Sequence, residues 1–173
     1  MSSKKIIVFD TSIVLCWLKV PGKDTCGPKG NEWNHEKVSS LINEFNDKAI
    51  FVLPMATLIE TGNHIAQCKG DRFKLATDFS EKIIKLCADA KAPWAAFIEQ
   101  HELWSSSSLL ELSKTWPELA KSGLTLGDAT IKNVAERYAS AGYDVEILTG
   151  DAGLKSYEPA KPVAIPRRRS HLK

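Results

Sequence analysis

Two carboxylates stand at the ends of apolar runs that are rich in strand-forming residues. Asp10 follows the run KKIIVF and precedes the hydroxyl residues Thr11 and Ser12, and Asp151 follows the run EILTG, which contains Thr149. Packing alone gives no reason to place an acidic group where a buried strand ends. Because the carboxyl ends of parallel strands share one sheet edge, where ligands bind, we expect Asp10 and Asp151 to face a common site.

Two further carboxylates lie in helical patterns. Glu60 is part of LPMATLIETGNHI, and Asp128 opens the helix in LTLGDATI. Helices that follow parallel strands begin near the same sheet edge, so we expect both groups to converge on the same crevice. Asn63 and His64 share the helix face of Glu60, and Lys132 lies one turn beyond Asp128. These three side chains are interpreted as contacts to substrate or metal-bound water, or alternatively as packing, capping or solvated residues.

Four carboxylates in one cleft repel one another. A pair about 4 Å apart costs on the order of 4 kcal/mol at an effective dielectric constant of about 20. They stay ionised together only beside a cation, and hard oxygen ligands suit magnesium (Mg²⁺) or manganese (Mn²⁺). Such an ion lowers the pKa of a bound water and holds a phosphate oxygen next to it. The acidic set therefore predicts metal-dependent phosphodiester chemistry.

Each of these carboxylates also has an ordinary structural interpretation. The alternatives are a helix cap for Asp10, a turn residue for Asp151, a helix-surface acid for Glu60 and a helix-dipole partner for Asp128. Any one motif by itself leaves the choice open. The ordered set of four favours a shared site.

The elements that must position these groups follow from hydrophobic periodicity. Short apolar runs predict strands at 6–9, 50–53, 145–148 and 162–165. Helical patterns predict helices at 11–18, 35–46, 54–67, 71–90, 93–103, from 108 to an end or kink at Pro117, and 125–140. The composition predicts a loop at residues 20–34 and a linker at residues 104–108. Strands that alternate with helices predict an α/β fold with a mainly parallel sheet flanked by helices.

The four acidic motifs, VFDTSIV, ATLIETGNHI, LTLGDATI and ILTGDAGL, resemble in order, spacing and strand context those of the PIN-domain nucleases. The resemblance is greatest to the VapC-like type II ribonuclease toxins, and it covers nearly the whole chain. It implies a PIN-like, Rossmann-like sheet in a single domain over 1–166, followed by a basic C-terminal tail over 167–173. It also implies an Mg²⁺- or Mn²⁺-dependent endoribonuclease that cleaves single-stranded RNA or a structured RNA loop.

The resemblance also implies roles for individual residues. By analogy the catalytic residues and metal ligands are Asp10, Glu60, Asp128 and Asp151. Hydroxyl ligands or donors that orient the carboxylates would be Thr11, Ser12 and Thr149. Some family members carry a further acidic residue in the helix of Asp128, where this chain has Lys132 and Asn133. A second metal site would therefore lack a ligand.

The resemblance further implies a setting for the enzyme. We expect the toxin of a toxin–antitoxin or defence system, with an antitoxin protein and a second copy of the chain as partners. The alternative from another class is a nuclease-dead PIN scaffold that binds RNA or a protein. A haloacid-dehalogenase-type phosphatase is disfavoured, because that class needs an Asp at the position of Ser12.

Composition excludes several other classes. The chain has 173 residues and a formal net charge of +2, which fits one globular domain. Its four cysteines form no CxxC pair, so a structural zinc site is not expected. The sequence allows a disulfide between Cys16 and Cys26, but nothing in it marks the chain as secreted. No apolar segment is long enough for a membrane span, so we expect a cytoplasmic protein with no membrane partner.

Overall fold

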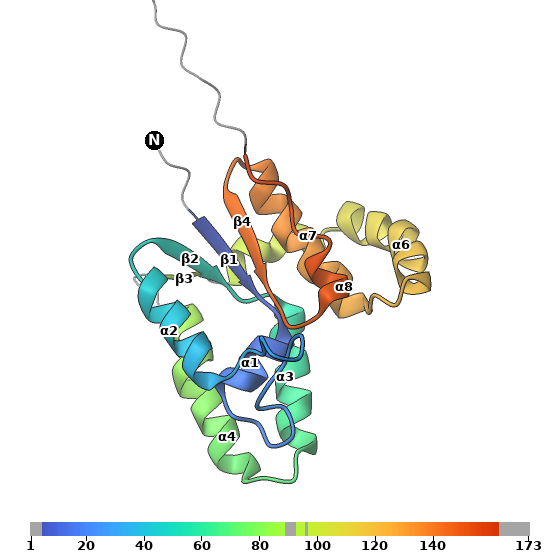
Figure 1. The fold of residues 1–173 in the computed structure, drawn as a ribbon. Helices are drawn as coiled ribbons and strands as arrows, with labels where there is room; N and C mark the ends of the chain where they lie inside the picture. Colours follow the sequence, from blue (N-terminus) through green and yellow to red (C-terminus); the bar gives the residue numbers. More distant parts are fainter. Residues whose placement is uncertain (1–4, 89–92, 96, 163–173) are drawn as a thin grey trace, which may run out of the picture.

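The computed structural model describes residues 5–88, 93–95 and 97–162, and in these ranges the chain forms an α/β fold. One parallel sheet has the strand order β3-β2-β1-β4 (Figure 1). Its strands are β1 (Lys5–Phe9), β2 (Ala49–Val52), β3 (Trp94–Ala95) and β4 (Asp144–Leu148). The parallel sheet flanked by helices confirms the fold class expected from the sequence.

The central strand β1 lies between β2 and β4, with Val8 opposite Val52 on one side and Ile147 on the other. Residues 6–9 are fully buried because helices cover both faces of the sheet. This burial explains why the run is continuously apolar, without the alternation of a half-exposed strand. The carboxyl ends of β1 and β4 therefore meet inside a shell of helices.

The helices divide into two groups (Figure 1). One face of the sheet is covered by α1 (Thr11–Trp17), α2 (His35–Phe45), α3 (Met55–Gln67), α4 (Arg72–Phe79) and the π-helical turn η1 (Ser80–Ile84), which continues into α5 (Lys85–Ala88). On the other side lie the 3-10 helix η2 (Phe97–Trp104), α6 (Ser106–Lys121), α7 (Leu126–Ser140) and α8 (Ala152–Lys155). Each face has its own hydrophobic cluster, and the sheet separates the two.

The sheet contains one strand that the sequence pattern did not predict. The expected strand at 162–165 falls largely outside the described residues, as does the basic tail. The strand beside β2 is instead β3, in a stretch expected to be helical from residue 93. Its Trp94 is buried, and its ring lies 5.1 Å from the Phe51 ring, so aromatic packing and sheet pairing override the local helical pattern.

Two further expectations near the same segment were wrong. Residues 104–108 are not a linker, because η2 ends at Trp104 and Ser105 directly caps α6, accepting a hydrogen bond from Ser108 N at 3.3 Å. Pro117 does not end α6, which continues to Lys121. The backbone carbonyl that a proline leaves unpaired belongs to Ser113, which is exposed, so water can satisfy it. The expected helix at 71–90 is confirmed through residue 88, with Asp71 as its cap.

Among the residues described, no helix combines the length and apolar character needed to cross a membrane.

The aromatic packing under β2 supplies a stability test. Phe51 is fully buried and contacts the rings of Phe9 and Trp94. Replacement Phe51→Ala should lower the free energy of unfolding by about 3 to 5 kcal/mol, because it leaves a cavity in the core. The matched control Phe73→Ala removes a side chain that is 84% exposed and should change it by less than about 0.5 kcal/mol. Urea denaturation measures both, and equal losses would contradict this picture of the core.

Candidate active site

The carboxylate of Asp10 occupies the end of β1 and is only 5% exposed. Its backbone N–H donates to Leu148 O on β4, which continues the strand ladder one residue past β1. Three groups donate to its side chain: Thr11 N to Oδ1 at 2.6 Å, Ser12 Oγ to Oδ2 at 2.6 Å and Thr149 Oγ1 to Oδ2 at 2.7 Å. The two predicted motifs at the chain's ends are therefore in direct contact.

The environment of Asp10 favours its neutral form. Burial raises the pKa of the Asp10 carboxyl above its ordinary value, and the hydrogen bonds from Ser12, Thr149 and Thr11 only partly offset this. The negative charge of Asp128 raises the pKa further. Asp128 is thus near enough to raise the pKa of Asp10, and a cation at this point would lower it.

The end of β4 is fastened to α1 by a second set of contacts. Thr149 Oγ1, besides donating to Asp10, accepts from Asp151 N at 2.9 Å, and Gly150 N donates to Ser12 Oγ at 3.1 Å. A methyl group on Gly150 would lie 2.6 Å from Cys26 Sγ and 2.7 Å from Gly27 N. The position therefore admits only glycine without displacing the backbone of the 20–34 loop.

Asp151 is exposed and caps α8. Its Oδ1 accepts from Gly153 N at 2.6 Å and from Leu154 N at 3.2 Å. Within the described residues Oδ2 has no donor, so one oxygen is committed to the turn and the other is not. The turn role and a ligand role are both compatible with this geometry.

Glu60 is brought to the site by α3. Thr57, one turn earlier, is fully buried and donates to Phe9 O at 2.9 Å, which fixes this helix against the end of β1. Glu60 Oε2 then accepts from Thr11 Oγ1 at 2.9 Å. Its other oxygen lies against Gly127, where a Cβ would come within 2.1 Å of Oε1. Glu60 thus bridges the first turn of α1 and the first turn of α7.

Asp128 lies on that first turn of α7 and forms a capping box with Thr125. Its Oδ2 accepts from Thr125 N at 3.0 Å and from Thr125 Oγ1 at 2.8 Å. Asp128 therefore has the helix-terminal role that its sequence position also allowed. It coexists with proximity to the site, because the neighbouring Gly127 touches Glu60.

The structure does not hold these groups as a closed metal cage. Over residues 5–88, 93–95 and 97–162, no three His, Cys, Asp or Glu side chains are close enough together to form one. The donor set nevertheless consists of carboxylate and hydroxyl oxygens alone, which fits Mg²⁺ or Mn²⁺ in type. Mg²⁺ commonly keeps several waters and uses one or two carboxylates, so a cage is not a requirement.

The remaining predicted site residues lie on the helix surfaces. Asn63 is exposed and His64 is half-buried on the face of α3 that carries Glu60. Lys132 forms an ion pair with Glu136 at 2.7 Å along α7. Its ion-pair partner thus lies on the same helix, and Lys132 forms no ion pair with any of the four site carboxylates.

A residue that sequence reasoning missed is Cys26. Its thiol lies beside Gly150, and hydrogen bonds with Cys16 and, to a smaller extent, Ser12 lower its pKa, while the contact with Cys26 raises the pKa of Cys16. Both cysteines are free thiols, so the possible disulfide is absent. No pattern in the Gly-rich 20–34 loop marks Cys26 as a neighbour of the site.

Comparisons with known protein families, with curated proteins and with solved structures find no match for this chain.

The close approach at Gly150 gives a prediction about the site's framework. Gly150→Ala should lower the free energy of unfolding by about 1 to 3 kcal/mol, because the new methyl meets Cys26 and the backbone of Gly27. The control Gly62→Ala lies in α3 with open space around it and should raise that free energy by roughly 0.5 to 1 kcal/mol. Urea unfolding of both variants checks this, and a stable Gly150→Ala protein would show that the loop does not pack on β4 as described.

The raised pKa of Asp10 predicts how stability depends on pH. Because the folded state holds the Asp10 proton more tightly than the unfolded chain, the contribution of Asp10 to the free energy of unfolding should fall as pH rises from about 4, the ordinary value for Asp, through its raised pKa. Asp10→Asn removes this dependence. In chelator, the variant should match wild type at pH 3.5 and exceed it at pH 7, as measured by thermal unfolding. A variant that is less stable at pH 7 than at pH 3.5, relative to wild type, would contradict the assignment.

Proposed function

We propose that this protein is a metal-dependent endoribonuclease of the PIN type, which hydrolyses phosphodiester bonds in single-stranded RNA. The observation that carries the proposal is the linked set at the sheet's carboxyl edge. Asp10 is buried between Ser12 and Thr149, and Thr11 ties the same point to Glu60. The resemblance of the four acidic motifs to PIN nucleases supports the choice of reaction.

The roles of the residues follow from their contacts. The groups that would hold the ion are Asp10, Glu60, Asp128 and Asp151. When bound, a divalent cation supplies an acidified water and neutralises a phosphate oxygen. The Ser12 and Thr149 hydroxyls hold the Asp10 carboxylate in one orientation. Thr11 does the same for Glu60, so that neither carboxylate has to reorganise during the reaction.

Electrostatics supports an ion at this place. Burial raises the pKa of the Asp10 carboxyl, and the negative charge of Asp128 adds to that rise. A divalent cation beside Asp10 would oppose both effects and favour its ionised form.

The biological setting rests on the sequence resemblance. A toxin that is neutralised by an antitoxin protein is the first candidate, and a homodimer is the expected assembly. A nuclease-dead scaffold that binds RNA or protein is the second candidate function. The observation that favours it is Lys132, one turn beyond Asp128, where some members of the resembled family carry a further acidic residue.

Cleavage of a mixed-sequence single-stranded RNA tests the first candidate. With Mg²⁺ or Mn²⁺, wild type should cleave, and both chelator and Asp10→Asn should reduce the rate by about 100-fold or more, because the ion and its central ligand are lost. The matched control Asp47→Asn, an exposed acid just before β2 at the opposite edge of the sheet, should retain the wild-type rate. Cleavage that is indifferent to both chelator and Asp10→Asn would point to a contaminant.

Metal binding has a readout that does not depend on activity. In thermal unfolding, Mn²⁺ at about 100 times its dissociation constant should stabilise wild type by about 2.7 kcal/mol and leave Asp10→Asn unchanged. Metal-independent RNA binding without cleavage, and without this stabilisation, would favour the scaffold.

A further inference from the structure

A groove runs alongside the second half of α3 and is closed on its other side by the start of the 20–34 loop. The loop contributes Pro21, Gly22 and Lys23, the end of the helix contributes His64 and Gln67, and the turn that follows it contributes Lys69. We call these six residues the α3 groove. The two walls are in contact just beyond it, since a Cβ on Gly70 would lie 2.7 Å from Pro21 Cγ.

The charged side chains that line this groove are all basic. Within the described residues neither Lys23 nor Lys69 has an ion-pair partner. Seven other described lysines form ion pairs, among them Lys132 with Glu136 and Lys85 with Glu81. A concave surface with two free ammonium groups, an imidazole and an amide suits an anion.

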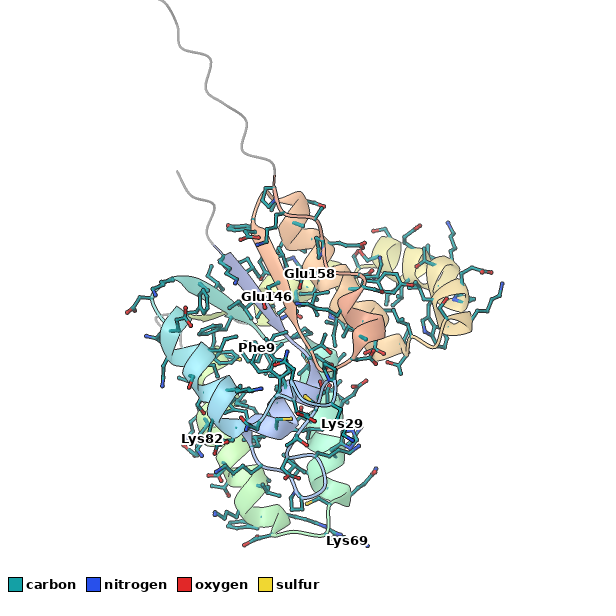
Figure 2. The ribbon with its side chains drawn as sticks, viewed as in Figure 1. Phe9, Lys29, Lys69, Lys82, Glu146 and Glu158 are labelled. Carbon is teal, nitrogen blue, oxygen red and sulfur yellow. The ribbon has the colours of Figure 1, made fainter. Side chains whose placement is uncertain are left out.

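The groove leads away from the candidate active site. His64 lies one helical turn after Glu60 on the same face of α3, a rise of about 6 Å, and Gln67 lies about one turn farther. In the view of Figure 2, Lys69 marks the far end of α3, and Lys29 of the same loop lies between Lys69 and the sheet. A chain that enters the carboxylate site would therefore pass over His64 before it reaches the lysines.

The helix dipole offers a simpler account of part of this set. Cations in the last turn of a helix stabilise its partial negative charge, and His64 occupies that turn of α3. The dipole gives no reason for Lys23, which belongs to a different segment and lies on the opposite wall of the groove. Lys23 is therefore the residue whose role distinguishes an anion-binding groove from ordinary stabilisation of the helix dipole.

We infer that the α3 groove binds the phosphodiester backbone of the RNA strand next to the bond that is cleaved. This inference rests on the proposed nuclease function and adds where the substrate lies. Lys23 and Lys69 supply charge to successive phosphates, and His64 and Gln67 supply hydrogen bonds. Contacts to the backbone alone are indifferent to base sequence and depend strongly on salt.

The test measures binding separately from cleavage. The probe is a mixed-sequence single-stranded RNA of 12 nucleotides with a fluorescent label, titrated in chelator against the Asp10→Asn protein. Adding Lys23→Gln and Lys69→Gln together should weaken binding about 10-fold and reduce the slope of log K against log salt by about 1.4, two phosphate contacts at about 0.7 each. The matched control, Lys74→Gln with Lys114→Gln, removes two exposed, unpaired lysines outside the groove and should change neither quantity.

The single Lys23→Gln variant decides between the groove and the helix dipole. It should weaken RNA binding about threefold and leave the melting temperature unchanged, because an exposed loop lysine does not stabilise α3. In the cleaving protein, Lys23→Gln with Lys69→Gln should lower kcat/KM mainly through a higher KM. Unchanged affinity and salt slope in the double variant would overturn the groove even if wild type cleaves RNA.

Failure of the nuclease and failure of the groove can be told apart. If wild type does not cleave but the double variant loses affinity and salt slope relative to its control, the groove stands and the nuclease fails. If the groove and control variants weaken binding equally, the attraction is a diffuse charge effect and the groove is overturned. Polyglutamate that competes as well as unlabelled RNA at equal charge would also overturn it.

Discussion

The buried carboxylate of Asp10 is the constraint on which this edge of the sheet depends. A carboxylate removed from water destabilises a fold unless donors surround it, and here the donors come from Thr11 and Ser12 on α1 and from Thr149 after β4. The hydrogen bond from Thr149 joins residues 139 apart in sequence. The contacts that solvate the charge are thus the same contacts that fix the ends of β1 and β4 to each other, next to Leu148.

The contacts around Asp10 also position α3 and α7. Thr11 turns its backbone N–H to Asp10 and its hydroxyl to Glu60, so one residue serves two carboxylates. Gly127 leaves room for Glu60 at the start of α7, and Asp128 follows it directly. Four elements therefore meet through short polar contacts and close approaches at glycine. An edge assembled in this way is specific in geometry, because polar contacts tolerate little displacement.

The sequence predicted β1, β2, β4 and the acidic positions because each depends on a local pattern: an apolar run, followed by Asp or by a helix start. It missed β3, since two residues are too few for any periodicity, and Trp94 is recruited by Phe51 from a distant part of the chain. The cap at Ser105 was missed for a different reason. A run of four serines offers several equivalent caps, and only tertiary packing chooses among them. Cys26 reaches Gly150 through loop geometry that no sequence pattern encodes.

The structural and chemical interpretations of the carboxylates are compatible, because a carboxylate has two oxygens. In Asp128 the capping box occupies Oδ2, and in Asp151 the α8 cap occupies Oδ1. Within the described residues the second oxygen of each lacks a donor. The fold therefore fixes the position of each group with one oxygen and leaves the other available, which is how a helix cap can also be a ligand. At Asp10 both oxygens accept protein hydrogen bonds, and an ion there would use the remaining lone pairs. Asp10 is therefore the carboxylate held by the most protein contacts, while Asp128 and Asp151 are each held by one oxygen.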